Sequence, residues 1–151
     1  LYLVSEGLLS QPTLYLSDFF EKNKSLYYDN LTRVRTHNDL IQWLKFFLVG
    51  VKQTAENSIN IFKSIIKIRQ DIEYQRILTL GKKTALAQKF LHYLYRKPII
   101  ESQEIAKEFN IEPSTALRLI EDFIKLEILK ETTGFKRNRI FRFDEYIKLF
   151  E

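Results

Sequence analysis

SQEIAKEFNIEPSTALRLIEDFIK, residues 102–125, has the pattern of two short helices joined by a tight turn. Ser102 is a residue type that favours the start of a helix, and Asn110 to Pro113 turn the chain. Pro113 suits the first position of the second helix, because the N–H group that proline lacks would have no partner there. Apolar residues recur on one side of each helix: Ile105, Ala106 and Phe109, then Ala116, Leu119, Ile120 and Phe123. We therefore expect a helix-turn-helix that buries these sides.

The residues on either side of this stretch extend the pattern. A further helix is expected before it, at 85–95, and ends at Lys97-Pro98. After it, 129–133 and 139–143 have the composition of two strands, with Gly134 at the bend between them, and 144–150 is expected to be a short helix. Three helices followed by a basic hairpin are typical of a winged helix-turn-helix, which we expect over residues 84–151.

The second helix of the pair would be the one that enters a DNA major groove. Its outward side chains are expected to be Ser114, Thr115, Arg118, Glu121, Asp122 and Lys125. The hairpin adds the cations Lys136, Arg137, Arg139 and Arg142. Hydroxyls and cations of this kind contact phosphates and guanine edges, so we take Ser114, Thr115, Arg118, Lys136, Arg137 and Arg139 as candidate nucleic-acid-binding residues.

The charge of this region also permits a different interpretation. Residues 84–151 carry 12 Lys and Arg against 11 Asp and Glu, whereas residues 1–83 carry 12 against 8, out of a net charge of +5. Specific DNA binding usually requires a basic face. The alternative is a scaffold or regulatory module in which the same fold contacts a protein.

Composition excludes several functional classes. The chain has no cysteine, so disulfides, thiolate metal sites and cysteine nucleophiles are excluded, and His37 and His92 are too far apart in sequence to form a ligand-spaced pair. The longest apolar run, 46–51, is far shorter than the roughly 18 residues that a membrane span needs. We expect a cytoplasmic protein with no membrane partner.

The first half of the sequence predicts helices. Leu1, Val4, Leu8 and Leu9 lie on one helical face, with no capping residue and no methionine before them, so we expect the chain to be a fragment that begins within a helix. Pro12 favours an extended segment over 13–16, and Ser17 is expected to cap a helix that runs to about Arg35. Asn38 or Asp39 is expected to cap the next helix.

That next helix is expected to run from Leu40 to about Leu80, where Gly81 ends it. It has two largely apolar stripes at helical spacing: Ile41, Leu44, Leu48, Val51, Ala55, Phe62 and Arg69 fall on the first, and Ile61, Ile65, Ile68 and Ile72 form the second. Both stripes must be buried, either against the rest of the chain or against a second copy in a homodimer.

The first half also resembles a known family. The matching residues are Leu1 to Leu9, Pro12, Leu14 to Ser17, Phe20, Tyr27-Tyr28, Leu31, Val34-Arg35, Trp43, Phe46 to Leu48 and Gly50-Val51. In this order and spacing they resemble the C-terminal part of Fic-domain proteins, over roughly residues 1–58. The resemblance implies a mainly α chain: a Fic-domain remnant at 1–58, a long connecting helix at 59–83 and the winged helix-turn-helix at 84–151.

Fic proteins transfer AMP from ATP to a hydroxyl group of a target protein, with Mg²⁺. The resemblance therefore implies a parent protein AMP-transferase that uses ATP and Mg²⁺ and acts on a protein target. The family's catalytic signature, His-Pro-Phe-x-(Asp/Glu)-Gly-Asn-Gly-Arg, has no match here, since the sequence contains no His-Pro and no Gly-x-Gly. We expect this chain to be non-catalytic and to hold no cofactor by itself.

The family's adenosine-binding positions correspond to Tyr27, Tyr28 and Arg35 of this chain. An aromatic ring could stack on adenine and Arg35 could donate a hydrogen bond to it, or the tyrosines could be packing residues and Arg35 a solvated cation. A function of another class is a transcription regulator that dimerises through its helical half and reads DNA with its winged helix.

Overall fold

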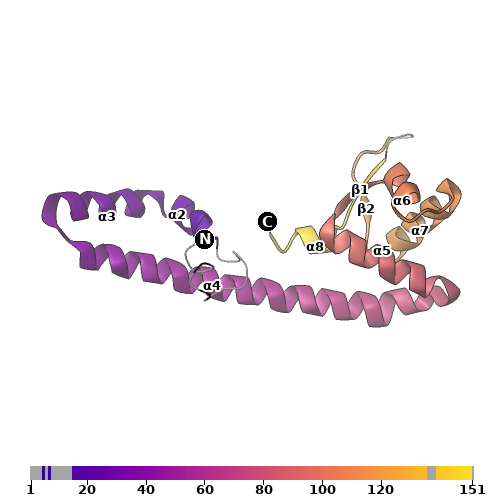
Figure 1. The fold of residues 1–151 in the computed structure, drawn as a ribbon, viewed down its shortest axis with the longest axis horizontal. Coiled ribbons are helices and arrows are strands. Elements are labelled where there is room, and N and C mark those ends of the chain that lie inside the picture. The colour runs from indigo at the N-terminus through magenta and orange to yellow at the C-terminus, as the bar shows by residue number, and fades with distance from the viewer. Residues whose placement is uncertain (1–4, 6, 8–14, 136–138, 151) are drawn as a thin grey trace. The chain divides into compact units, whose positions relative to one another are not determined.

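The computed structural model describes residues 5, 7, 15–135 and 139–150. The chain is mainly helical, with one small antiparallel sheet, and divides into two compact units, Leu1–Phe62 and Lys63–Glu151 (Figure 1). Within the described part of the chain, every helix is too short or too polar to cross a lipid bilayer.

The first unit contains helices α2 (Leu16–Lys22), α3 (Lys24–His37) and the start of α4 (Leu40–Asp71). Asn38 ends α3 in the left-handed conformation, with φ of 51°. Asp39 then caps α4, because its Oδ1 accepts a hydrogen bond from the amide of Gln42 at 3.1 Å. The prediction that Asn38 or Asp39 caps this helix is therefore confirmed for Asp39.

The predicted start and continuity of the preceding helix are wrong. Helix α2 already begins at Leu16, with Tyr15 as its N-cap, so Ser17 lies inside the helix instead of capping it. The chain then breaks at Asn23, whose side-chain Nδ2 donates to the carbonyl of Phe19 at 2.8 Å. An asparagine that bonds to the backbone in this way competes with helix continuation, which explains two helices in place of one.

The predicted helix over Leu1 to Leu9 lies largely outside the described residues.

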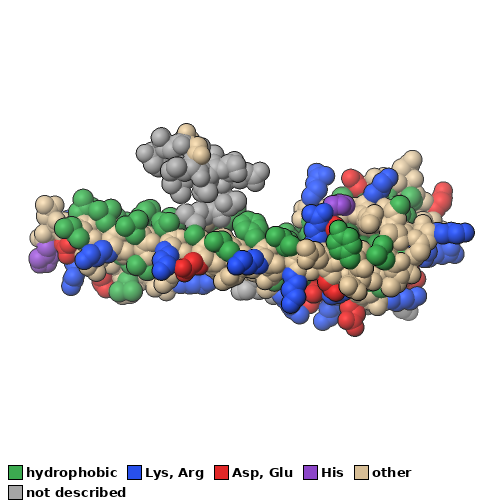
Figure 2. Space-filling model, turned by 90° about the horizontal axis from the view of Figure 1, so that it is seen from below, with side chains coloured by type: hydrophobic (Ala, Val, Ile, Leu, Met, Phe, Trp, Pro, Cys, Tyr) green, Lys and Arg blue, Asp and Glu red, His purple; other side chains and the backbone are tan. Residues whose placement is uncertain are grey.

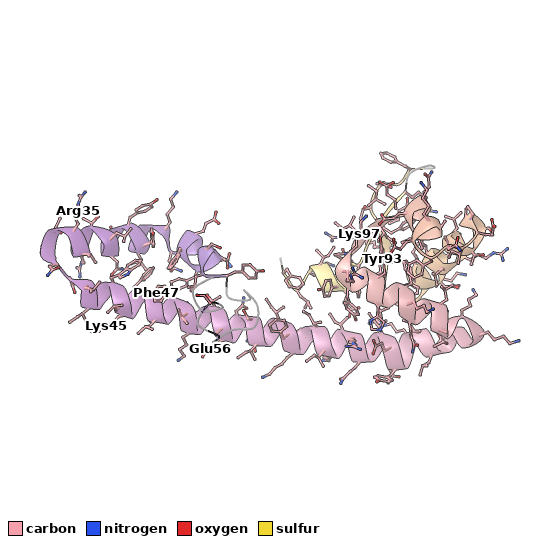
Figure 3. All side chains as sticks on the ribbon, viewed as in Figure 1. Arg35, Lys45, Phe47, Glu56, Tyr93 and Lys97 are labelled. Atoms are coloured by element: carbon pink, nitrogen blue, oxygen red, sulfur yellow. The ribbon has the colours of Figure 1, made fainter. Side chains whose placement is uncertain are left out.

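Aromatic rings pack the helices of the first unit together. Phe20 on α2 contacts Tyr27 on α3 and Trp43 on α4, with ring centroids 5.1 and 6.5 Å away. Gly50 allows α4 to approach α2 closely, because a Cβ at this position would lie 2.6 Å from the ring of Phe19. Phe47 faces α3 in the same cluster (Figure 3). Trp43, Phe46 and Phe47 are half-buried in this cluster.

The second unit begins with the end of α4 and continues as a π-helical turn, η1 (Ile72–Arg76), and a 3₁₀ segment, η2 (Ile77–Lys83). The α-helix thus ends at Asp71, earlier than the predicted end near Leu80, and the chain stays helical in other forms until Gly81, which leaves the helical conformation with φ of 55°. The remaining elements are α5 (Thr84–Arg96), β1 (Ile99–Glu101), α6 (Ser102–Glu108), α7 (Pro113–Lys125), β2 (Lys130–Glu131), β3 (Ile140–Arg142) and α8 (Asp144–Ile147).

The sheet has a strand that the sequence did not predict. Its order is β1-β3-β2, and β3 pairs antiparallel with both neighbours, so that Ile100 lies opposite Phe141 and Lys130 opposite Arg142. The predicted two-stranded ribbon is therefore one part of a three-stranded sheet. Strand β1 has only three residues, and its pairing partner lies about forty residues away, so no local pattern indicates it.

Apolar packing holds the second unit together. The face predicted to be buried on α7 is confirmed, and the ring of Phe123 lies 4.6 Å from that of Phe90 on α5. Ile68, Ile72 and Ile77, from the end of α4 and the turns after it, belong to the same core. The unit boundary at Phe62 therefore assigns most of the predicted connecting segment, 59–83, to the second unit.

Two tyrosines on α5 provide a matched test of this packing. The Tyr95 hydroxyl is buried with no hydrogen-bond partner among the described residues, whereas the Tyr93 hydroxyl donates to Glu104. We expect Tyr95→Phe to raise the free energy of unfolding by about 1 kcal/mol, because it removes an unsatisfied buried group. Tyr93→Phe should lower it by about 1 kcal/mol through the lost hydrogen bond. Urea denaturation followed by circular dichroism tests both, and a Tyr95→Phe protein less stable than the original would contradict this packing.

Candidate nucleic-acid interface

Helix α7 exposes the candidate DNA-contacting residues on one side. Its first turn is anchored at Glu112, whose carbonyl accepts hydrogen bonds from the amides of Thr115 and Ala116 at 2.9 and 3.0 Å. The side opposite the core carries Ser114, Thr115, Arg118, Glu121 and Lys125, all exposed, and we call it the α7 face. The structure thus brings Ser114, Thr115 and Arg118 together over the first two turns of one helix.

Asp122 does not belong to this face, and its predicted outward position is wrong. Its side chain is largely buried and accepts a hydrogen bond from Nζ of Lys83 at 2.5 Å. Lys83 lies at the end of η2, 39 residues earlier in the chain, which explains why the sequence did not reveal the pair. The carboxylate is neutralised, so of the two adjacent acids only Glu121 faces outward.

Arg118 does not take part in the ion pairs described for the second unit. Its side chain is exposed, and the part of the chain that the structure describes offers it no salt-bridge partner. An unpaired guanidinium can form two parallel hydrogen bonds with a phosphate or with a guanine edge. The α7 face therefore presents a guanidinium whose hydrogen-bonding capacity is fully available, close to two hydroxyl groups.

The hairpin cations differ among themselves. Arg139 forms a salt bridge with Glu131 on the neighbouring strand, and its guanidinium lies 5.1 Å from the ring centroid of Phe141. The hydrogen bond from Arg139 lowers the pKa of Glu131 below its ordinary value. Arg139 thus joins the ends of β2 and β3, and it has less capacity for an outside anion than Arg118. Lys136 and Arg137 lie outside the described residues.

Arg142 is also engaged within the chain. Its Nε donates to Oδ1 of Asp144 at 2.8 Å, and Lys148 contacts the other oxygen of that carboxylate at 2.7 Å. The hydrogen bond from Lys148, and to a smaller extent that from Arg142, lowers the pKa of Asp144 below its ordinary value. Asp122, Glu131 and Asp144 therefore each have a cation beside them. These three carboxylates therefore contribute little negative potential of their own at the surface of the unit.

A second polar cluster joins α5 to α6. Glu104 accepts hydrogen bonds from Nζ of Lys97, at 2.5 Å, and from the hydroxyl of Tyr93 (Figure 3). Partial burial alone would raise the pKa of Glu104, but the hydrogen bonds from Lys97 and Tyr93 outweigh it and lower this pKa. Burial and the bond to Glu104 raise the pKa of Tyr93. The cluster fixes the start of α6 and hence the turn that leads to α7.

Arg76 is a structural residue that the sequence analysis missed. Its guanidinium pairs with Asp71 at 2.6 Å and with Glu145 on α8 at 3.1 Å, and it also reaches the carbonyl of Leu126 at 3.4 Å. Glu145 is 69 residues away in sequence, so no spacing could have indicated the contact. Arg76 borders an open groove of about 950 Å³ with charges of both signs on its walls.

The adenosine-side candidates lie in the first unit. Tyr27 is half-buried, with its ring 5.5 Å from that of Trp43, which is the arrangement of a packing residue. Tyr28 is 56% exposed and Arg35 is exposed; seven residues apart, they share one face of α3. Arg35 points away from α4 (Figure 3). Tyr27 therefore packs inward, with its ring 5.4 Å from that of Tyr28, whereas Tyr28 and Arg35 are exposed.

Cofactor-holding groups are sparse in the described chain. Within residues 15–135 and 139–150, no three His, Asp or Glu side chains gather closely enough to hold a metal ion. Tyr28 and Arg35 could contact a purine, but no phosphate-binding loop accompanies them in the sequence.

The Lys97–Glu104 pair should make the stability of the folded chain depend on pH. Because the folded chain lowers the pKa of Glu104, the pair contributes stability above the unfolded-state pKa, and this contribution is lost as pH falls through the lower folded-state value. We expect Lys97→Gln to lower the melting temperature at neutral pH. Its effect should shrink as pH falls and vanish below the folded-state pKa of Glu104, where the carboxylate is protonated in both the folded and the unfolded chain.

The matched control is Lys107→Gln, which removes an exposed lysine from α6 and leaves Glu104 with its partners. Its melting temperature should follow that of the original chain at every pH. An equal loss at neutral and acid pH for Lys97→Gln would show that this pair does not set the pKa of Glu104.

No protein-family model matches this chain, so the residues and geometry described above are the basis for inferring its function.

Proposed function

We propose that the second unit is a winged helix-turn-helix that binds double-stranded DNA through the α7 face. The order of elements supports this proposal. Helix α5, strand β1, helices α6 and α7 and the β2–β3 hairpin follow one another as that fold requires, with a tight turn at Asn110, where φ is 48°. Of the residues predicted to be buried in the helix pair, five belong to the core of the unit, and Ala106 and Phe109 are partly buried against it.

The observation that carries the DNA proposal is the exposed Arg118 beside Ser114 and Thr115. Hydroxyl groups at the start of a helix and a guanidinium one turn later are suited to a phosphate and a base edge. The neutralised Asp122 removes a carboxylate that would repel the duplex. Lys125 on the same face adds a cation.

Glu121 and the exposed Leu117 on the same helix favour the competing function, a protein contact. The two functions differ in salt dependence. A protein–DNA complex loses affinity steeply as salt rises, because phosphate contacts release counterions. A partner protein held by apolar contacts would show a much weaker dependence.

We propose in addition that the first unit is a helical part of a Fic-type AMP-transferase, and that a neighbouring catalytic loop would act with ATP and Mg²⁺. The support for this is the ordered set of residues between Leu1 and Val51, together with the exposed face that Tyr28 shares with Arg35. The alternative is a dimeric winged-helix transcription regulator, in which the first unit has no nucleotide role.

The DNA proposal predicts the behaviour of one variant pair. Arg118→Ala should weaken binding to a fluorescein-labelled duplex by about tenfold, which is the loss of affinity expected when one phosphate or base contact is removed. Arg33→Ala removes the same charge from an exposed position in the first unit and should leave the affinity unchanged. Fluorescence anisotropy at low and at rising salt measures both. Absence of a complex at low salt, or equal affinities for the two variants, would overturn the proposal.

The AMP-transferase proposal predicts that this chain alone modifies nothing. It has no His-Pro pair to provide the proton acceptor and no glycine-rich loop for the phosphates. Incubation with labelled ATP, Mg²⁺ and a cell extract should give no labelled protein above the level without the chain. A complete Fic-type enzyme in the same extract serves as the positive control. Labelling that depends on the chain would show that it contains a catalytic site, and would refute the proposal that it is only a helical part of the enzyme.

A further inference from the structure

An apolar stripe is exposed along the part of α4 that belongs to the first unit. Ile41, Leu44, Leu48 and Phe62 expose 68%, 47%, 62% and 51% of their surface, and Val51 and Ala55 between them are half-buried. We call these six residues the α4 stripe. Figure 2 shows hydrophobic side chains at the surface of this unit, interspersed with Lys and Arg side chains. Among residues 15–135 and 139–150, no packing buries these four side chains fully.

The α4 stripe is distinct from the surface that packs on α2 and α3. That packing uses Trp43, Phe46 and Phe47, together with Gly50 against Phe19. At 100° per residue, these positions centre on the side of α4 roughly 130° from the stripe. The first unit therefore uses one face of α4 for its own helices and leaves a second apolar face exposed.

The spacing of the stripe indicates what kind of surface would cover it. Its residues alternate at intervals of three and four, with Ser58 in the one position that interrupts the apolar series. A period of 3.5 keeps a seam facing a second helix over a long distance, and this seam is about 32 Å long at 1.5 Å per residue. The partner must therefore be a helix of similar length and spacing.

Charged side chains beside the stripe argue against a lipid surface. Helices that lie on membranes have a broad apolar face, and Leu40 and Ile59, which are also about half exposed, extend the stripe. Lys45, Lys52 and Glu56, however, lie along one edge of it, and Lys52 and Glu56 contact each other at 3.9 Å. Lys45 points away from α3 (Figure 3). Polar side chains so close to the seam would prevent deep insertion into a bilayer.

The exposed area suits an interface between proteins. Monomeric proteins rarely leave more than a few hundred Å² of contiguous apolar surface uncovered, and a specific interface buries roughly 800 Å² on each partner. Four large side chains, each about half exposed or more, line this seam, so it is an uncovered apolar surface of the kind that an interface covers. In the sequence itself, the helix that matches the seam in length and spacing is α4.

We propose that the chain forms a homodimer in which the α4 stripes of two copies pack against each other. In this arrangement Ile41, Leu44 and Leu48 of one copy lie against the same stripe of the other. The aromatic cluster with α2 and α3 stays intact in each copy, because it uses a different face of the helix. The proposal does not depend on DNA binding or on a nucleotide site.

The test is sedimentation equilibrium of the 151-residue chain across the micromolar range. The original chain should sediment as a dimer that dissociates on dilution. Leu48→Glu should weaken the dimer by about tenfold or more, because it places a charge in the seam. Leu48 is exposed in the single chain, so its replacement costs no internal packing, and an unchanged circular dichroism spectrum would establish this.

Gln53→Glu is the matched control, since it adds the same charge at an exposed position of α4 outside the stripe. It should dimerise as tightly as the original chain. A monomeric original chain, or equal dimerisation of Leu48→Glu, would overturn the proposal. A second experiment measures binding of the chain to vesicles of anionic lipid. If the chain is monomeric in solution but binds vesicles, and Leu48→Glu abolishes this binding, the stripe contacts a membrane surface instead.

Discussion

Burial of one side of α7 is the interaction on which the arrangement of the second unit depends. The ring of Phe123 lies 4.6 Å from Phe90, and Ala116, Leu119 and Ile120 complete the buried side against α5 and α6. A helix with one side fixed in a core has no freedom to rotate about its axis. Ser114, Thr115 and Arg118 are therefore held outward by residues that never contact a ligand. The candidate interface is a consequence of core packing, and it would be lost if that packing were lost.

The two units differ in how their apolar residues are used. The second unit has a contiguous core, which reaches from Ile68 at the end of α4 to Phe143. In the described part of the first unit, Asn30 and Gly50 are buried, whereas the large apolar side chains are half-buried or exposed. An assembly of helices with so little buried apolar surface has little to offset its conformational entropy. This contrast is the physical reason to expect that another helix covers α4, whatever function the second unit has.

Sequence reasoning succeeded where structure is local. The buried side of α7, the start of that helix at Pro113, the cap at Asp39 and the break in helical conformation at Gly81 all follow from short patterns, whereas the end of α4 at Asp71 does not. It failed where a contact joins distant residues: Lys83 with Asp122, Arg76 with Glu145, and β1 with β3. It also failed at Asn23, where a single side chain competes with the helix. Of the candidate site, the exposed residues of α7 could be predicted, but not the internal salt bridge that occupies Arg139.

The central claim is that the outer side of α7 contacts DNA, and amide chemical shifts measured by NMR during titration with a short duplex test it most directly. The account predicts that the amides of Ser114, Thr115 and Arg118 shift first and furthest, while the buried amides of Leu119 and Phe123 move little. Shifts confined to the groove beside Arg76, or to the first unit, would contradict it. So would a spectrum that does not change when duplex is added at low salt.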